Sequence, residues 1–158
     1  MVWVILIVLV LLGVFQFNYY IELKKYLVFK DMESSITTTL PLPEGTFTLQ
    51  YLHSVHKTPV YEMYSVNDRG QLILTETRFS SLGVGMPYTP EEGTFSNEDG
   101  EFRITGLSRK YNQLPLRISS IPGHTVIIRR QAYPLVDFTK PDGLVIIHAV
   151  KKWAVIKR

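Results

Sequence analysis

From Gly45 to the end of the chain, apolar and polar residues alternate with a period close to two. Side chains of a β-strand point to opposite faces with this period, whereas an amphipathic helix repeats about every 3.6 residues. The pattern predicts short strands at 47–54, 60–66, 71–79, 94–96, 101–104, 114–119, 125–128, 132–135, 144–150 and 153–156. Short strands separated by turn residues are typical of an antiparallel β-sandwich or a barrel-like domain, so we expect a mainly β fold.

Three segments have the residue types of hairpin turns. Asn67–Gly70 and Asn97–Gly100 each end in a glycine, which tolerates the positive φ that tight turns often require. Arg129–Gln131 lies between two apolar runs and predicts a third hairpin. Because hairpins join consecutive strands, these turns favour antiparallel pairing.

The segment Tyr51–Tyr64 places two ionisable residues on strand faces that are otherwise apolar. The two faces consist of Phe47, Leu49, Tyr51 and His53, and of Val60, Glu62, Tyr64 and Val66. A charged group removed from water is costly unless it is paired. We therefore expect His53 and Glu62 to contact each other or a shared partner.

Two further ionisable residues follow the same pattern. Alternation from Leu72 places Glu76 on one face with Leu74 and Arg78, and His124 alternates with apolar residues of the 125–128 strand. The sequence thus predicts a polar site built from four residues, His53, Glu62, Glu76 and His124. Such a set could hold zinc or a similar divalent ion, bind a small ligand or partner by hydrogen bonds, or form a purely structural network.

The sequence offers little support for other chemistry. Ser54 points away from His53 on a regular strand, and no nucleophile-elbow motif occurs. The glycine-rich stretch Gly83–Pro87 lacks the lysine and following helix of a phosphate-binding loop. We therefore expect no enzymatic activity and no cofactor. The alternatives are a metal-dependent enzyme using His53, Glu62 and His124, or a purely structural envelope protein.

The N-terminal segment differs from the rest of the chain. Residues 1–21 carry no charged side chain, and aromatic residues stand at both ends, Trp3 at one and Tyr19 and Tyr20 at the other. About 20 apolar residues span a bilayer as a helix, and aromatic residues favour its interfaces. A cleaved signal peptide would need a basic start and a site of small residues, which are missing. We expect an uncleaved, single-pass membrane anchor at residues 1–22.

The remaining chain divides at residue 39. Residues 23–39 are expected to form a linker or a first strand, and residues 40–158 a β-rich domain. Lys24, Lys25 and Lys30 follow the expected anchor, so the positive-inside rule taken alone places the domain in the cytoplasm.

Composition excludes several classes of protein. The chain has no cysteine, which rules out disulfides, thiolate zinc sites and a cysteine nucleophile. The formal net charge is +3, and the basic residues are largely scattered rather than gathered with aromatic residues. We therefore expect no nucleic-acid partner.

Several stretches together resemble the DUF1850 family, a domain of unknown function. They are Phe47–Val55, Thr58–Glu62, Leu72–Phe79, Ser81–Pro87, His124–Ile128 and Tyr133–Leu135. The residues that match the family pattern are His53, Ser54, Pro59, Glu62, Glu76, Gly83, Gly85, Pro87 and His124. The resemblance implies that these residues, apart from Pro59, contact a ligand or a partner.

The resemblance also implies a cellular role. Members of the family resemble one another as small proteins with an N-terminal membrane segment, many of them encoded beside TRAP-type solute transporters with TAXI-class binding proteins. It implies an extracytoplasmic accessory module at the cell membrane, with the transporter's membrane subunits or its solute-binding protein as partner. Unlike many members, this chain has no lysine or arginine before the apolar segment.

Overall fold

The computed structural model describes residues 2–53, 57–80, 93–98, 100–119 and 121–157. The chain divides into two compact units, one formed by Met1–Lys24 with Lys151–Arg158 and the other by Lys25–Val150. The smaller unit contains the helix α1 (Val2–Asn18). The larger unit contains most of both β-sheets.

The helix α1 exposes its apolar side chains. Every residue from Val2 to Leu12 has an exposed apolar side chain. The described residues include no helix that is both long enough and apolar enough to cross a membrane. The helix ends at Asn18, and the next residue already belongs to a strand.

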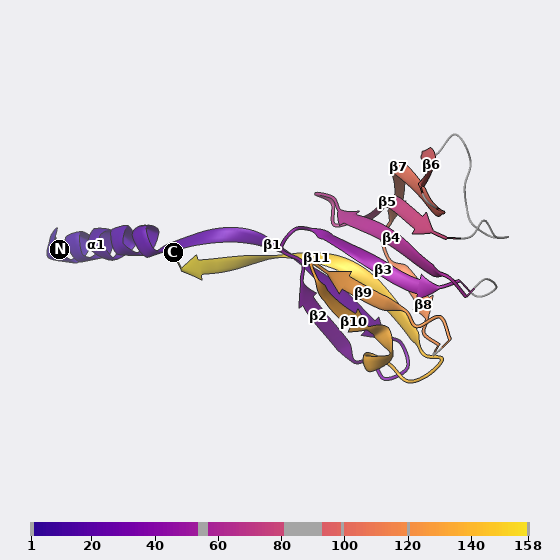
Figure 1. Ribbon diagram of the computed structural model, residues 1–158. Helices are drawn as coiled ribbons and strands as arrows, with labels where there is room; N and C mark the ends of the chain where they lie inside the picture. Colours follow the sequence, from indigo (N-terminus) through magenta and orange to yellow (C-terminus); the bar gives the residue numbers. More distant parts are fainter. Residues whose placement is uncertain (1, 54–56, 81–92, 99, 120, 158) are drawn as a thin grey trace. The chain divides into compact units, whose positions relative to one another are not determined.

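One sheet has four strands (Figure 1). Their order is β2 (Thr37–Pro41), β1 (Tyr19–Asp31), β11 (Leu144–Lys157) and β8 (Leu114–Arg117). Residues 23–31, the first part of the expected linker or first strand, lie in β1. The run Leu27–Phe29 is buried without alternation, which indicates that β1 is covered on both faces at this point.

The other sheet has seven strands. Their order is β10 (Gln131–Pro134), β9 (Thr125–Ile128), β3 (Thr46–Leu52), β4 (Pro59–Val66), β5 (Leu72–Phe79), β7 (Glu101–Tyr111) and β6 (Thr94–Glu98). Its neighbouring strands pair antiparallel. A short 3-10 helix, η2 (Leu135–Asp137), follows β10. The expected mainly β, antiparallel fold is confirmed, and the two sheets are consistent with a sandwich.

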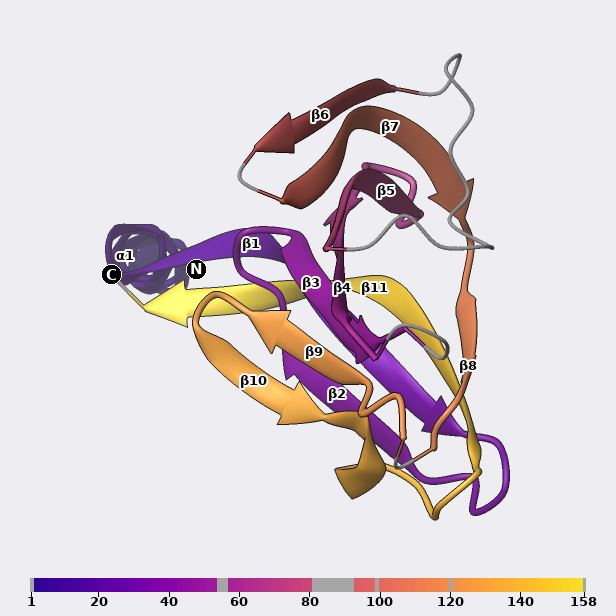
Figure 2. The same ribbon diagram turned by 45° about the vertical axis from the view of Figure 1, so that its right-hand side comes forward.

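The three predicted hairpins are present. Gly70 and Gly100 both have positive φ, at 78° and 85°. The first turn joins β4 to β5, and the second joins β6 to β7. The third is tighter than expected, because β10 already begins at Gln131 and pairs it with Ile128. Figure 2 shows β9 and β10 side by side at one end of their sheet, and β6 and β7 at the other.

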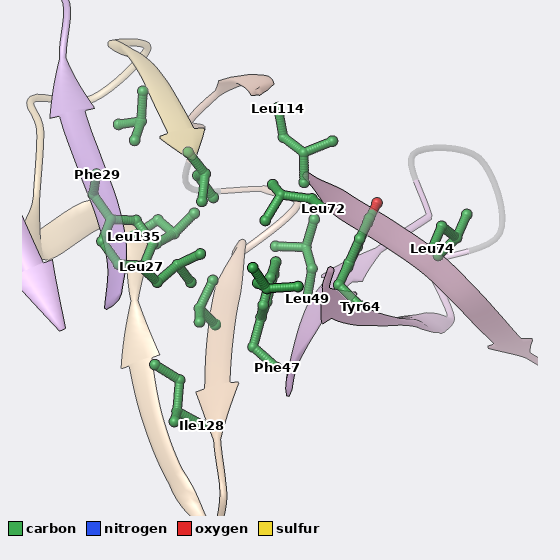
Figure 3. Packing of buried hydrophobic residues seen from close by; sticks show 14 of the residues in the cluster. Leu27, Phe29, Phe47, Leu49, Tyr64, Leu72, Leu74, Leu114, Ile128 and Leu135 are labelled. Atoms are coloured by element: carbon green, nitrogen blue, oxygen red, sulfur yellow. The ribbon is translucent and has the colours of Figure 1, made fainter. Parts of the chain in front are cut away.

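A single cluster of buried apolar side chains joins the two sheets of the larger unit. The four-stranded sheet contributes Leu27, Phe29, Val145 and Ile147, and the seven-stranded sheet contributes Phe47, Leu49, Val60 and Leu72 among others. Figure 3 shows labelled members of the cluster, with the hydroxyl-bearing side chain of Tyr64 among them. The polar residues of the site described next therefore adjoin the apolar core.

Candidate functional site

Glu62 lies on the core-facing side of β4, as the alternation of the sequence predicts. Its neighbours on this face, Val60 and Tyr64, are buried. On the adjacent strands, Glu62 lies opposite Leu49 of β3 and Thr77 of β5, which are also buried. A partly buried carboxylate in apolar surroundings requires hydrogen-bond donors.

Two tyrosine hydroxyls supply those donors. Tyr64 Oη donates to Glu62 Oε2 at 2.7 Å, and Tyr51 Oη donates to Glu62 Oε1 at 3.1 Å. Each carboxylate oxygen thus has its own hydroxyl. Hydrogen bonds to an ionised acceptor are stronger than those between neutral groups, and the shorter of these two is the stronger by geometry.

The site favours the protonated form of both tyrosines. Burial raises the pKa of Tyr64 and of Tyr51 well above the usual range, and the negative charge of Glu62 raises both further. Both hydroxyls therefore remain donors at any physiological pH. The ring of Tyr64 is itself fixed by stacking on Phe47, with centroids 5.0 Å apart.

His124 joins this group through Tyr51. β3 pairs with β9 so that Gln50 lies opposite Thr125, which brings the residue before β9 next to Tyr51. The two rings lie with their centroids 5.6 Å apart. Burial lowers the pKa of His124, and its Nδ1 atom is buried without a hydrogen-bond partner among the described residues. The imidazole is thus neutral at pH 7 and retains a ring nitrogen that can accept or donate a hydrogen bond.

His53 lies at the loop that joins β3 to β4. Its backbone nitrogen donates to Thr58 O at 2.9 Å, and Lys57 N donates to His53 O at 3.0 Å. Lys57 has a positive φ of 53°. β3 and β4 therefore form a hairpin closed at His53 and Thr58. We call the group of Tyr51, Glu62, Tyr64 and His124 the tyrosine–glutamate cluster.

Glu76 does not belong to this cluster, and its predicted face is wrong. The register of β5 shifts between Leu74 and Glu76 against both neighbouring strands, so Thr75 forms a bulge. A bulge adds one residue and reverses the alternation beyond it. Leu72 and Leu74 are buried before the bulge, but Thr77 and Phe79 are buried after it, which places Glu76 on the opposite face.

On that face Glu76 pairs with arginines. Its Oε1 atom lies 2.5 Å from Arg78 Nε and 3.3 Å from Arg103 Nε. All three side chains remain partly exposed, so these ion pairs contribute little stability. The role of Glu76 is to neutralise arginines on the outer face of β5 and β7.

The predicted metal site is not assembled as expected. With Glu76 on the other face, the four proposed ligands are not brought together. No group of three or more metal-ligating side chains occurs within the described ranges. Ser54, Gly83, Gly85 and Pro87 lie outside the described residues.

Two features of the structure were missed by sequence reasoning. Tyr51 and Tyr64 were recognised as members of apolar faces but not as the partners of Glu62; their position beside a carboxylate on the same face was the available signal. Asp31, which lies within the segment expected to be a linker or a first strand, is buried and accepts hydrogen bonds from Ser34 and from Thr139 Oγ1, the latter at 2.9 Å. These bonds, with that of Glu33 N, lower the pKa of Asp31 to about 2.

The arrangement defines a class of protein: a mainly β domain with two antiparallel sheets and a carboxylate held by two tyrosine hydroxyls on the core side of one of them. The chain belongs to the DUF1850 family, a domain of unknown function, which matches residues 47–135. This match covers more than half of the chain and runs from β3 to the start of η2, so it contains the whole tyrosine–glutamate cluster. No curated protein and no solved structure matches the chain.

Proposed function

We propose that this protein is a membrane-anchored β-domain that serves as an accessory module of a TRAP-type solute transporter with a TAXI-class binding protein. The observation that carries the proposal is the surface of α1. From Val2 to Leu12 the exposed fraction of each side chain lies between 47% and 79%, and all eleven residues are apolar. Such a continuous apolar surface is unfavourable in water and favourable in lipid. The proposed anchor comprises residues 1–22, in which Glu22 at the end is the one residue with a charged side chain.

The proposed domain is extracytoplasmic, in contact with the transporter's membrane subunits or its solute-binding protein. The support for this orientation is the resemblance within the DUF1850 family. Lys24 and Lys25 after the helix would favour the opposite orientation by the positive-inside rule. Protease accessibility of the domain in intact spheroplasts tests the point, since only an extracytoplasmic domain is cleaved there.

The tyrosine–glutamate cluster is the proposed contact site for the partner. Glu62 accepts two hydrogen bonds, whereas an ionised carboxylate has about four acceptor positions, so it retains capacity for an external donor. His53 directly follows β3, the strand that carries Tyr51, so the proposed contact extends to His53.

The test is recovery of transporter subunits with the tagged full chain from detergent-solubilised membranes. We expect the wild-type chain and a Glu98→Gln control, which changes an exposed glutamate on β6, to recover them equally. Glu62→Gln should recover less, while its purified form still gives a cooperative unfolding transition. Failure of the wild-type chain to recover any subunit, together with normal solute uptake in a strain that lacks the gene, would overturn the proposal.

A further inference from the structure

A second polar site lies on the four-stranded sheet, apart from the tyrosine–glutamate cluster. A cavity of about 430 Å³ is lined by Lys30, Met32, Asn112, Gln113, Ile146 and His148. In β11 the buried residues Val145 and Ile147 alternate with Ile146 and His148. The cavity is therefore on the face of this sheet that points away from the core. All six residues belong to the larger unit.

The lining has the composition of an anion site. Lys30 supplies a positive charge, and Asn112 and Gln113 supply side-chain amides. None of the described residues that line the cavity is acidic. Burial, followed by the charge of Lys30, lowers the pKa of His148, so the imidazole is neutral at pH 7. Met32 and Ile146 provide an apolar surface beside these polar groups.

A chain of three side-chain amides fixes which atom Asn112 presents. At its start, Asn67 Oδ1 accepts from two backbone nitrogens, those of Arg69 at 3.0 Å and Gln71 at 2.9 Å. A backbone N–H can only donate, so the oxygen of the Asn67 amide must face them. Its Nδ2 atom therefore points the other way and donates to Gln71 Oε1 at 3.0 Å.

The orientation of the Asn67 amide determines the orientation of the Asn112 amide, which lines the cavity. Because the oxygen of Gln71 accepts from Asn67, its Nε2 atom donates to Asn112 Oδ1 at 3.1 Å. This bond occupies the oxygen side of the Asn112 amide and leaves its NH₂ group as the donor available to the cavity. The backbone of the β4–β5 turn thus selects a donor, and not an acceptor, at the lining of this cavity.

We propose that this cavity binds a small organic carboxylate. Its carboxylate group meets the Lys30 ammonium and the Asn112 NH₂ group, and its short alkyl part contacts Met32 and Ile146. Charge-assisted hydrogen bonds of this kind discriminate strongly against an uncharged analogue. The apolar part of the lining distinguishes an organic carboxylate from an inorganic anion, which has no group to place there.

Calorimetric titration of the full chain in detergent micelles tests the ligand class, with sodium butyrate, butyramide and inorganic phosphate as probes. We expect saturable binding of butyrate, about tenfold or more tighter than that of butyramide or phosphate. Equal binding of butyrate and butyramide overturns the role of charge. Phosphate binding as tight as that of butyrate overturns the assignment to an organic carboxylate, and the absence of saturable butyrate binding overturns the site.

Two variants test the residues. Lys30→Met should weaken butyrate binding by about tenfold, whereas Lys140→Met, a change at an exposed lysine that does not line the cavity, should leave it unchanged. An unchanged affinity in Lys30→Met overturns the site. Lys30→Gln, which removes the charge but keeps a polar side chain at this exposed position, replaces Lys30→Met if that variant does not fold.

Asn67→Asp tests the amide chain, because it retains the acceptor for the backbone nitrogens and replaces the donor with an acceptor. The side-chain amide of Gln71, and then that of Asn112, should flip, so that each exchanges the positions of its oxygen and its NH₂ group. The Asn112 oxygen then faces the carboxylate, and butyrate binding weakens. In an Asn112→Ala background the same substitution should have a smaller effect, limited to that of the added charge. An equal effect in both backgrounds overturns the proposed relay of orientation.

Discussion

Removal of the Tyr64 hydroxyl is the most informative perturbation of the tyrosine–glutamate cluster. Tyr64→Phe keeps the ring that stacks on Phe47 but leaves Glu62 Oε2 without its donor at 2.7 Å. A hydrogen bond to a charged group contributes about 1.5–3 kcal/mol. Tyr64 is only 4% exposed, so water has little access to replace the hydroxyl. We expect a loss of about 2 kcal/mol in the free energy of unfolding.

The matched substitution at Tyr51 should cost less, about 1 kcal/mol, because its bond to Glu62 is longer at 3.1 Å and Tyr51 is less buried. Tyr61→Phe, on the opposite face of β4, is the control and should change stability by less than about 0.5 kcal/mol. Equilibrium unfolding in urea, with a common slope for all variants, measures these differences.

A triple variant separates the hydrogen bonds from general damage to the core. Replacing both partners of a buried polar pair with apolar groups can be nearly neutral, whereas removing one partner is costly. Tyr51→Phe and Tyr64→Phe combined with Glu62→Leu should therefore be more stable than the same two tyrosine substitutions with Glu62 retained. A Tyr64→Phe variant as stable as the wild type, or a triple variant less stable than the double, would refute the reasoning.

Three further predictions concern other parts of the chain. Deletion of residues 2–18 should preserve the β-sheet circular dichroism spectrum, whereas deletion of residues 2–39 should abolish cooperative unfolding, because it removes all of β1 and most of β2. Asp31 has its pKa lowered from 3.8 to about 2 in the folded state, so its stabilising contribution is complete above about pH 4 and is lost as the pH falls towards 2. Asp31→Asn should therefore make the free energy of unfolding, measured in urea, less dependent on pH in this range. The control Asp137→Asn, at an exposed position, should leave this dependence unchanged. Glu76→Gln should lower the free energy of unfolding by less than about 1 kcal/mol, with a loss that shrinks in high salt; a larger loss in thermal or urea unfolding would contradict the outer-face position of Glu76.

The alternation of apolar and polar residues was sufficient to predict the antiparallel β fold and the core-facing position of Glu62. Phe47, Leu49, Val60 and Tyr64 are buried on the predicted faces. These strands are regular, so the two-residue period holds from end to end. The residue types of the turns were sufficient to predict the hairpins, because the positive φ of Gly70 and Gly100 is a requirement of the turn itself and does not depend on the rest of the fold.

The face of Glu76 could not be predicted by counting alternate residues. The bulge at Thr75 reverses the alternation within a single strand, and the residues of β5 carry no proline or glycine to mark it. Thr75 Oγ1 donates to Met63 O at 3.1 Å, across to the neighbouring strand. The position of the bulge is set by this pairing with β4 and β7, which a single strand does not reveal.

The secondary structure of β1 could also not be predicted from its sequence alone. A short apolar run such as Tyr26–Phe29 is compatible with a buried helix or a buried strand, and periodicity does not distinguish the two. In the structure β1 lies between β2 and β11 and supplies Leu27 and Phe29 to the core. Residues before 40, which the sequence assigned to a linker or a first strand, therefore supply β1 and most of β2 to the four-stranded sheet.

We propose that α1 and the residues next to it hold this β-domain at a membrane. The most direct measurement is fractionation of cells that express the full chain, with the membrane fraction washed in alkaline carbonate and the protein then detected in pellet and supernatant. We expect the full chain to stay in the washed membrane pellet and a chain lacking residues 2–18 to be released. Release of the folded full chain by the wash would contradict it.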